Sequence, residues 1–355
     1  MTAIAGVDGP QYVAVGAVFN LTNSTNLTCS ISTLSVTSSD IAVVPLTNIT
    51  FSGTYPNCVA TLFSSQSSGT SIITITARNE YNQLATRSFI FTAISKPVLV
   101  FSFRKIMKNY FGNAMRMRRV SDNAEQDIGF DSNGNFDLTA YNTFRGVSTL
   151  RVRTWYDQSG NGYNANQSTN ANQPTVTIAG FNGAPQVEFS GLYWLISTQA
   201  QNVTTSNRDL TVFFAGKATT VNQIGYGSFN PGNASDRIGI HLNWGDNFIY
   251  WDSPGLCCAN SRLSLNNAAN VNVSRVYVFG RNNATQYIKI NGTTVSSRIN
   301  ASGTYGSPTT PWYLGSGSNA ASSSSPLAEY MQYITGLTDA QVDSITNEQK
   351  NYFGL

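Results

Sequence analysis

The sequence predicts an all-β protein of two domains. Short apolar runs separated by Ser, Thr, Asn and Gly recur about every eight to twelve residues, the spacing of antiparallel strands and turns. A length of 355 residues exceeds that of one ordinary small domain. Only 11% of the residues are charged, where about a quarter is usual, and neutral polar residues fill the gap. This balance is typical of β proteins exposed outside cells or on particle surfaces.

Residues 1–96 are predicted to form the smaller domain. Its clearest element is a hairpin, in which Thr70–Ala77 and Ala85–Thr92 alternate apolar and polar residues around the turn Asn79–Asn82. The hairpin resembles the last one of bacterial and viral immunoglobulin-like modules, and about ninety residues suits such a sandwich. The tryptophan expected between the cysteines of an antibody domain is missing, so the resemblance is to the sandwich alone. Ser95-Lys96-Pro97 marks the boundary, because proline interrupts strand pairing.

Residues 97–355 are predicted to form a larger β domain. Phe103–Tyr110 can make a short helix, and the strand Ala114–Val120 follows it. Further strand-like runs are Thr175–Ile178, Gln186–Phe189, Leu210–Phe214, Arg237–Leu242, Phe248–Trp251, Val271–Phe279, Gln286–Ile290 and Trp312–Leu314. This many strands in about 230 residues suits a jelly roll of two sheets.

The chain ends in its best-defined helix. Thr338 is a good N-cap with Gln341 three residues later, and Leu337 and Val342 occupy the two positions of a hydrophobic staple. Val342 and Ile345, with Tyr352 and Phe353 further on, can then cover part of a sheet.

Several motifs of the second domain resemble a known family. The segments Met115–Leu138 and Val152–Ser168 are similar to the N-terminal part of the catalytic domain of the fungal α-L-arabinofuranosidase B family. They also resemble lectin-type jelly rolls of phage and giant-virus structural proteins, and the ending Ala328–Phe353 is similar too. The most specific part is Tyr156, Asp157, Gln158, Ser159, Gly160, Asn161 and Gly162. The resemblance implies a concanavalin A-like (lectin/LamG-type) jelly roll for residues 97–355, with this stretch as its signature turn.

The resemblance implies glycosidase chemistry only where two carboxyl groups are kept. A retaining glycosidase needs a nucleophile and an acid/base about 5 Å apart. Asn243 stands nearest the family's nucleophilic Glu, and the segment Tyr313–Asn319 that corresponds to the acid/base is followed by no acid before Glu329. We therefore predict that the protein is not an enzyme. A hydrolase would have to recruit Glu329, Asp246 or Asp252.

No other catalytic or metal site is predicted. The single histidine, His241, lies in a strand pattern, so a Ser-His-Asp or Cys-His mechanism would depend on that one residue. A core or sheet-face position is the expected role for it. Asp131–Asn135 resembles a calcium loop but lacks the distal Glu, and a polar turn is expected there. The sequence predicts no cofactor.

Carbohydrate binding is the function that the remaining residues favour. Sugars are bound by aromatic faces, while amides and carboxylates hydrogen-bond the hydroxyls. Both kinds of group occur in one hairpin, at Trp244, Asp246, Asn247, Tyr250, Trp251 and Asp252. In the alternative interpretation the tryptophans lie in the core and Asp246-Asn247 is only a turn. Trp155 and Tyr156 are expected in the core.

Four cysteines and a set of glycosylation sequons bear on the protein's environment. Cys29 and Cys58 lie in two strand-like runs and either form a disulfide or remain buried thiols. Cys257-Cys258 either closes a vicinal ring or stays reduced, and neither pair has the spacing of a zinc site. N-glycosylation is permitted at Asn20, Asn23, Asn26, Asn48, Asn166, Asn202, Asn233, Asn272, Asn283, Asn291 and Asn300.

The sequence favours a structural or attachment protein. We predict a virion-surface component, in a capsid, spike or fibre, that contacts other capsid or surface-assembly proteins and host glycans and is compatible with a homo-oligomer. A net charge of +3 without long basic runs argues against nucleic acid. No window of about eighteen apolar residues predicts a membrane span. The start MTAIAGVDGP shows no signal peptide. The alternatives are an arabinofuranosidase-like hydrolase and a secreted cell-surface adhesin.

Overall fold

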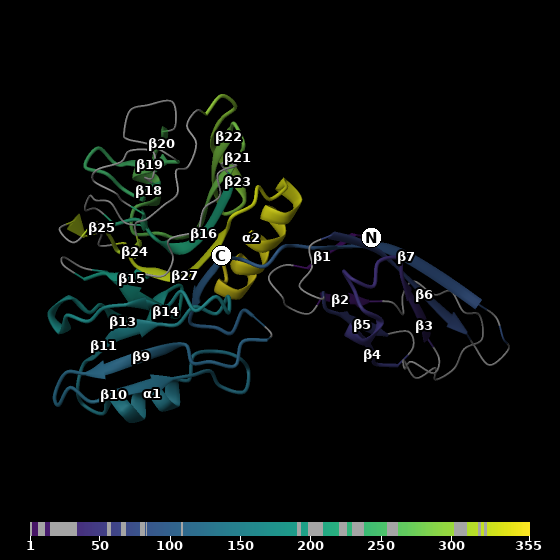
Figure 1. Cartoon of the computed structure of the whole chain (residues 1–355), viewed down its shortest axis with the longest axis horizontal. Helices are drawn as coiled ribbons and strands as arrows, with labels where there is room; N and C mark the ends of the chain where they lie inside the picture. Colours follow the sequence, from purple (N-terminus) through teal and green to yellow (C-terminus); the bar gives the residue numbers. More distant parts are fainter. Residues whose placement is uncertain are drawn as a thin grey trace. The chain divides into compact units, whose positions relative to one another are not determined.

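The protein is predominantly β and divides into two compact units, Met1–Lys96 and Pro97–Leu355. The computed structural model describes residues 2–5, 11–14, 34–54, 58–64, 69–78, 82, 84–107, 109–189, 193–197, 209–219, 226–228, 238–253, 262–301, 311–318, 321–322 and 325–355. Figure 1 shows the strands and helices of both units, and each unit is described by itself. In this part of the chain no helix has the length and apolar character needed to cross a membrane.

The first unit is a sandwich of two sheets. One sheet has the order β1 (Thr2–Ala5), β7 (Leu84–Ala93), β6 (Gly69–Arg78), β3 (Leu34–Ser38), and the other β2 (Gln11–Ala14), β5 (Val59–Leu62), β4 (Ile49–Ser52). The 3-10 helix η2 (Leu46–Asn48) precedes β4. Apolar side chains of both sheets meet in one core, including Leu34, Ile49, Leu62, Ile73 and Phe91.

The predicted hairpin of the first unit is present. Strands β6 and β7 pair in unbroken antiparallel register from Gly69 opposite Ala93 to Arg78 opposite Leu84. Ile73 and Ile75 are fully buried, so the face that alternation assigns to the core is the one that packs.

The second unit contains two large sheets. The first, which we call the back sheet, has the order β23 (Thr293–Arg298), β22 (Thr285–Ile290), β21 (Ser274–Asn282), β16 (Leu210–Lys217), β27 (Leu327–Tyr333), β8 (Leu99–Ser102). The second, which we call the front sheet, has the order β10 (Glu125–Ile128), β9 (Met115–Arg119), β11 (Leu150–Trp155), β12 (Ala165–Asn166), β15 (Leu195–Ser197), β24 (Trp312–Leu314), β17 (Tyr226–Ser228), β18 (Ile238–His241), β19 (Phe248–Asp252), β20 (Arg262–Asn266).

Smaller elements complete the second unit. The hairpin β13 (Thr175–Phe181) and β14 (Ala184–Glu188) joins the two sheets, since β13 pairs with β11 and β14 with β27. The remaining elements are β25 (Ser316–Ser318), β26 (Ala321–Ser322), the helices α1 (Leu138–Arg145) and α2 (Asp339–Phe353), and the 3-10 helices η3 (Asn170–Asn172) and η6 (Ala268–Asn270). The architecture is therefore the predicted all-β one with a C-terminal helix.

One core lies between the front and back sheets. Two rows of buried front-sheet side chains, each aligned by register pairing, face this core. One contains Ile128, Met115, Trp155 and Ala165, and the other contains Leu195, Leu314, Tyr226, Ile240 and Trp251. From the back sheet, Phe101 packs on Trp155 with ring centroids 5.8 Å apart. Because strand side chains alternate, the next row along the front strands faces outward.

Helix α2 covers the outer face of the back sheet. It begins with the predicted capping box, in which Thr338 and Gln341 bond each other's backbone amides. Phe353 packs edge-on against Phe181 and belongs to a small core with Ala215, Val276 and Ala328. The outward side chains of β27 are therefore as buried as the inward ones.

The short helix predicted at Phe103–Tyr110 is wrong: the described residues there are not helical, and the short helix of this unit is α1 instead. The cause is a long-range contact. The Gln158 amide donates to the carbonyl oxygens of Ser102 and Arg104 and accepts from the backbone N–H of Ile106. These bonds satisfy an extended backbone that local propensity does not favour.

The signature turn Tyr156–Gly162 joins the two sheets. The buried Asp157 carboxylate accepts hydrogen bonds from the backbone amides of Val100, Ser159 and Tyr163, at 3.0, 2.9 and 3.1 Å, and from the Ser159 hydroxyl. Gly160 and Gly162 have φ of 81° and 75°, a conformation that glycine adopts without strain. Asp157 follows β11 and bonds β8, so its task is structural.

Candidate functional site

The outer face of the front sheet carries a continuous row of paired residues, which we call the front row. Pairing from strand to strand aligns Arg116, Thr154, Asn166, Ile196, Tyr313, Gly227, Gly239, Asp252 and Arg262. Neighbouring strands lie about 4.8 Å apart, so the row runs about 38 Å across the sheet. Unlike the back sheet, this face is polar and aromatic.

Asp252 is the centre of an ion-paired cluster at one end of the front row. Its carboxylate accepts from Arg262 Nε at 2.6 Å and Nη2 at 2.7 Å, and His241 Nε2 lies 3.7 Å from Oδ2. Burial favours a higher pKa for Asp252, but the hydrogen bonds from Arg262 and the nearby His241 imidazole outweigh it and lower the pKa. Asp252 is thus a fixed anion that orients Arg262, and it is poorly suited to donate a proton.

A group of exposed and half-buried residues adjoins this cluster at the turn between β18 and β19. We call it the aromatic edge, and it consists of Trp244, Asp246, Asn247, Phe248 and Tyr250. The rings of Phe248 and Tyr250 are stacked with centroids 6.1 Å apart, and Trp244 lies 6.5 Å from Tyr250. Of the Trp244 surface 38% is exposed, so an indole is open to a ligand.

The polar groups of the aromatic edge are held in place by the turn. Asp246 accepts from the backbone N–H of Phe248 at 3.0 Å and from the Tyr250 hydroxyl. The bond from Tyr250 is the main cause of a lowered pKa for the exposed Asp246 carboxyl. Asn247, with φ of 65°, donates its backbone N–H to the Trp244 carbonyl and leaves its side chain exposed. A carboxylate, an amide and an indole therefore meet at one edge.

Two of the six predicted sugar-binding residues are corrected by the structure. Trp251 is fully buried and packs against Phe279 in the core, 5.7 Å between ring centroids, so it does not face a ligand. Asp252 lies on the outer face but is also fully buried, and Arg262 occupies its carboxylate. The other four, Trp244, Asp246, Asn247 and Tyr250, are brought together at the surface.

Sequence reasoning missed four residues of this face. Phe248 and Arg262 flank Tyr250, with the Arg262 guanidinium 4.4 Å from the centre of its ring. Tyr313 and Trp194 pack together with centroids 5.8 Å apart on the other side of Gly227 and Gly239. Period-two alternation could have placed Phe248 beside Tyr250. The other three depend on pairing between strands distant in sequence.

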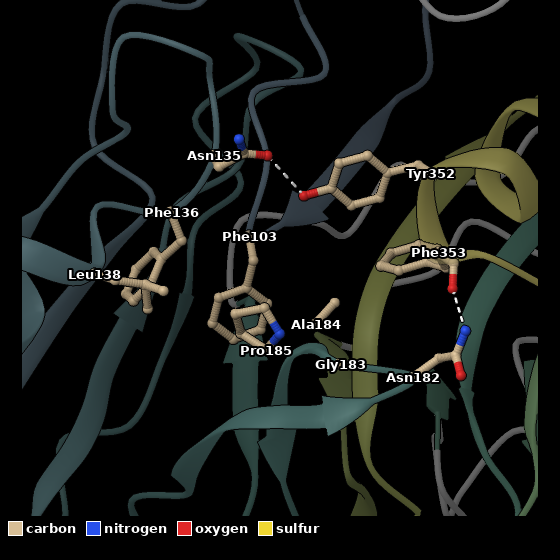
Figure 2. Close-up of a pocket in the computed structure, with 10 residues that line it drawn as sticks. All are labelled: Phe103, Asn135, Phe136, Leu138, Asn182, Gly183, Ala184, Pro185, Tyr352 and Phe353. Carbon is tan, nitrogen blue, oxygen red and sulfur yellow. Dashed lines mark hydrogen bonds between the residues drawn. The ribbon is translucent and has the colours of Figure 1, made fainter.

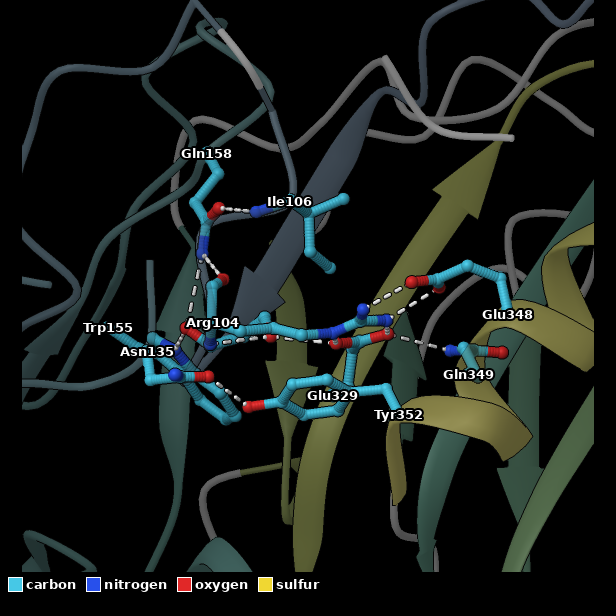
Figure 3. A network of polar contacts seen from close by, with 10 residues as sticks. Arg104, Ile106, Asn135, Trp155, Gln158, Glu329, Glu348, Gln349 and Tyr352 are labelled. Carbon is cyan, nitrogen blue, oxygen red and sulfur yellow. Dashed lines mark hydrogen bonds and ion pairs between the residues drawn. The ribbon is translucent and has the colours of Figure 1, made fainter. Parts of the chain in front are cut away.

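Glu329, the first acid that a hydrolase would have to recruit, has its carboxylate held by hydrogen bonds and an ion pair within the fold. Figure 3 shows its carboxylate accepting from Arg104 Nε at 2.8 Å and Gln349 Nε2 at 3.0 Å, while Arg104 also bonds Glu348. Ser102 donates a further hydrogen bond at 2.8 Å. The side chain of Glu329 is fully buried, so it anchors α2 to the back sheet.

Asn243, which was predicted to stand nearest the family's nucleophilic Glu, is also a structural residue. Its side chain is buried at the end of β18 and donates to the carbonyl oxygen of Thr219 at 2.6 Å. The Asp131 turn likewise bonds itself, accepting from the amides of Asn133 and Asn135. In the described part of the chain no group of acids, cysteines and histidines could hold a metal ion.

A hollow of about 390 Å³ lies between α1, the β13–β14 turn and the end of α2 (Figure 2). Its lining consists of Phe103, Asn135, Phe136, Leu138, Asn182, Gly183, Ala184, Pro185, Tyr352 and Phe353. The two amides serve the fold: Asn135 accepts from the Tyr352 hydroxyl at 2.9 Å, and Asn182 donates to the Phe353 carbonyl. A second hollow is bordered by Ser297–Asn300. Neither is lined by a carboxylate side chain.

The cysteines and most sequons remain predictions. Cys58 is disulfide-bonded. The predicted pairing with Cys29 is not tested, because Cys29 lies outside the described residues, as do Cys257, Cys258, Asn20, Asn23, Asn26, Asn202 and Asn233. Six of the predicted glycosylation asparagines are among the described residues. Asn272, Asn283 and Asn291 have positive φ in turns, and the other three are Asn48, Asn166 and Asn300.

Comparisons with known proteins support the fold. No protein-family model matches the sequence, and no curated protein matches it. A mutant GH54 α-L-arabinofuranosidase soaked with 4-nitrophenyl α-L-arabinofuranoside is similar in structure, with a TM-score of 0.53 and 18% identity over 71% of this chain and 62% of that chain. An arabinofuranosidase complexed with arabinofuranosyl-α-1,2-xylobiose gives a TM-score of 0.52 and 17% identity over 71% and 61%.

The chain thus spans about three-fifths of the length of these enzymes. At such low identity the similarity establishes a shared β-rich, jelly-roll-like fold. The residues that bear on function lie on the outer face of the front sheet, which we call the front face.

Proposed function

We propose that the second unit is a non-enzymatic carbohydrate-binding module that attaches the protein to glycans through its front face. The observation that carries the proposal is the exposed indole of Trp244 beside Asp246 and Asn247. An aromatic ring can cover the apolar side of a sugar while the carboxylate and amide hydrogen-bond its hydroxyls. The similarity to arabinofuranosidase structures adds a fold in which sugars are bound.

A binding role is favoured over hydrolysis by the state of the acids. Glu329 and Asp252 are both fully buried and ion-paired, and Asp246 is exposed at a turn. Retaining hydrolysis needs two facing carboxyls, one of them with a raised pKa. The pKa values of Asp246 and Asp252 are instead lowered. Release of 4-nitrophenol from an aryl arabinofuranoside by the purified protein would contradict the non-enzymatic role.

We further propose that the attachment role belongs to a virion surface, with other capsid proteins as partners. The low share of charged residues and the resemblance of the first unit's hairpin to immunoglobulin-like modules support this setting. A secreted adhesin is the alternative. Detection of the protein in purified virus particles, at a constant ratio to the major capsid protein, tests the virion setting directly, and its absence from particles would favour the adhesin.

A glycan array with Trp244→Ala tests the binding proposal. We expect the wild-type protein to bind at least one glycan class. The variant should bind it roughly tenfold more weakly, because a stacked aromatic contact contributes about 0.5–1.5 kcal/mol beyond its buried area. Phe111→Ala is the matched control, because Phe111 is 88% exposed but lies outside the front face. Equal binding by both variants would place the sugar elsewhere.

A further inference from the structure

Four arginine side chains lie at the end of the front face opposite the aromatic edge. We call Arg116, Arg118, Arg151 and Arg153 the arginine patch; they belong to the paired strands β9 and β11, whose apolar partners Met117 and Val152 face the core. Arg118 and Arg151 stand directly opposite each other in the ladder. Like charges placed in this way repel, so the arrangement costs stability unless something offsets it.

Carboxylates compensate only half of the patch. Arg116 forms a bidentate pair with Asp127, at 2.9 Å for both bonds, and Arg153 lies 3.5 Å from Glu125. Arg118 bonds the neutral oxygens of Gln173, Asn123 and Asn170. Arg151 bonds the backbone oxygen of Gln173 at 3.0 Å and the Tyr193 hydroxyl at 3.2 Å.

Arg118 and Arg151 therefore carry positive charge that no described carboxylate meets at ion-pair distance. Arg118 is only 6% exposed, and burial together with the charge of Arg151 lowers its pKa. On the β11 side the register row continues from Arg151 through Thr175 to Glu188, two strands or about 10 Å away. On the β10 side Glu125 stands opposite Arg118, but its carboxylate lies 3.5 Å from Arg153. The surplus charge is focused at Arg151.

Arg151 is also the accessible member of the pair. Its guanidinium lies 4.5 Å from the centre of the Tyr193 ring, and this contact helps to hold the guanidinium plane in place. Two of its five N–H donors bond the protein, so the others are left for a ligand. A planar guanidinium with free donors matches an oxyanion such as a carboxylate.

We propose that the front face binds an acidic polysaccharide, whose sugar-borne carboxylates are held by Arg151 while neutral parts of the chain reach the aromatic edge. This inference rests on the proposed glycan-binding function and names its substrate class. The arginine patch and the aromatic edge lie at the two ends of a face about 38 Å wide, so a polymer rather than a single sugar can reach both.

The test is a titration of four probes into the full chain at low salt: oligogalacturonate, dextran sulfate, neutral dextran and single-stranded DNA. The variants are Arg151→Gln, Arg151→Lys, Trp244→Ala and Arg145→Gln. Arg145, exposed at the end of α1, is the control because its replacement removes the same charge from another surface. Thermal unfolding checks that each variant folds.

Oligogalacturonate is expected to bind most tightly. Arg151→Gln should weaken it roughly tenfold or more, Arg151→Lys by less, and Arg145→Gln hardly at all. Equal losses of affinity for Arg151→Gln and Arg145→Gln, or tighter binding of DNA than of oligogalacturonate, would overturn the inference. Tighter binding of dextran sulfate would also overturn it, because the ligand group would then be a sulfate ester and not a carboxylate. Binding of neutral dextran that depends on Trp244 but not on Arg151 would overturn the inference and keep the proposed function. Uronate binding that depends on Arg151 but not on Trp244 would keep the charge site and overturn the aromatic one.

Discussion

Two arginine networks of the second unit differ in whether carboxylates of the same chain pair with the arginines. On the back sheet Arg104 is enclosed by the carboxylates of Glu329 and Glu348, and the Tyr352 ring lies 4.2 Å from its guanidinium (Figure 3). On the front sheet Arg118 and Arg151 are met by amides, carbonyls and a phenol. The first network has its charges paired within the chain, and the second has a surplus.

The difference follows from what covers each face. Helix α2 seals the back sheet, and a charge under a helix has to be paired because an unpaired buried charge costs several kcal/mol. The front face has no such helix among the described residues, so Arg151 is partly solvated and can keep a charge for a ligand, while the buried Arg118 is bonded by neutral oxygens. The contrast separates the residues that hold the fold from those that can bind.

The largest expected effect on stability is at the back-sheet network of Arg104, Glu329 and Glu348. Glu329→Gln leaves Arg104 buried with only the more exposed Glu348 as a carboxylate partner, and should lower the free energy of unfolding by about 3–5 kcal/mol. Denaturant unfolding followed by tryptophan fluorescence measures this, since every tryptophan lies in the second unit. A loss below about 1 kcal/mol would mean that the network does not anchor α2.

The signature turn should come next. Asp157→Ala removes the acceptor for the amides of Val100, Ser159 and Tyr163 and should cost about 3 kcal/mol, because buried N–H groups are left without partners. The same unfolding experiment applies. Asp131→Ala, in an exposed turn with a similar pair of amide bonds, is the control and should stay within about 1 kcal/mol.

The ion pair behind the aromatic edge gives a pH-dependent prediction. The pKa of Asp252 is lowered in the folded protein, so its stabilising contribution is complete above the unfolded value of about 3.9 and is lost as the pH falls toward the folded pKa. Asp252→Asn should cost about 2 kcal/mol at pH 6. Unfolding at pH 6 and pH 2.5 should show the gap between wild type and variant shrinking at low pH, and a constant gap would contradict the assignment.

The smallest effect is expected at the exposed pair of the arginine patch. Arg116→Gln breaks the pair with Asp127, whose partners are 43% and 29% exposed, and should change the unfolding free energy by no more than about 1 kcal/mol. Comparison with Glu329→Gln under identical conditions sharpens the contrast between the two faces. A loss of unfolding free energy as large as that of Glu329→Gln would show that the arginine patch stabilises the fold.

Local signals in the sequence predicted much of this fold. Alternation placed the β6–β7 hairpin and its buried face, and the capping box placed the start of α2. The same alternation separates Trp251 from Tyr250, so the error on Trp251 was avoidable from the sequence. These features depend on neighbours along the chain, which a single sequence contains.

Long-range pairing set the rest. The Gln158 side chain determines the backbone conformation of residues about fifty positions earlier, and this replaced the predicted helix. The front row joins strands from Arg116 to Tyr313 whose register the sequence does not state. For this reason the aromatic edge could be proposed from one hairpin, whereas Arg151 and Tyr193 could not.

Tryptophan quenching tests the central claim most directly. Trp155, Trp251 and Trp312 are fully buried, whereas Trp194 and Trp244 lie on the front face, so acrylamide quenching reports mainly on that face. We predict that a glycan which binds the protein reduces the quenching constant, and that Trp244→Ala removes most of this protection. Calorimetrically verified glycan binding that leaves the quenching of the wild-type protein unchanged would contradict the claim that the front face is the binding surface.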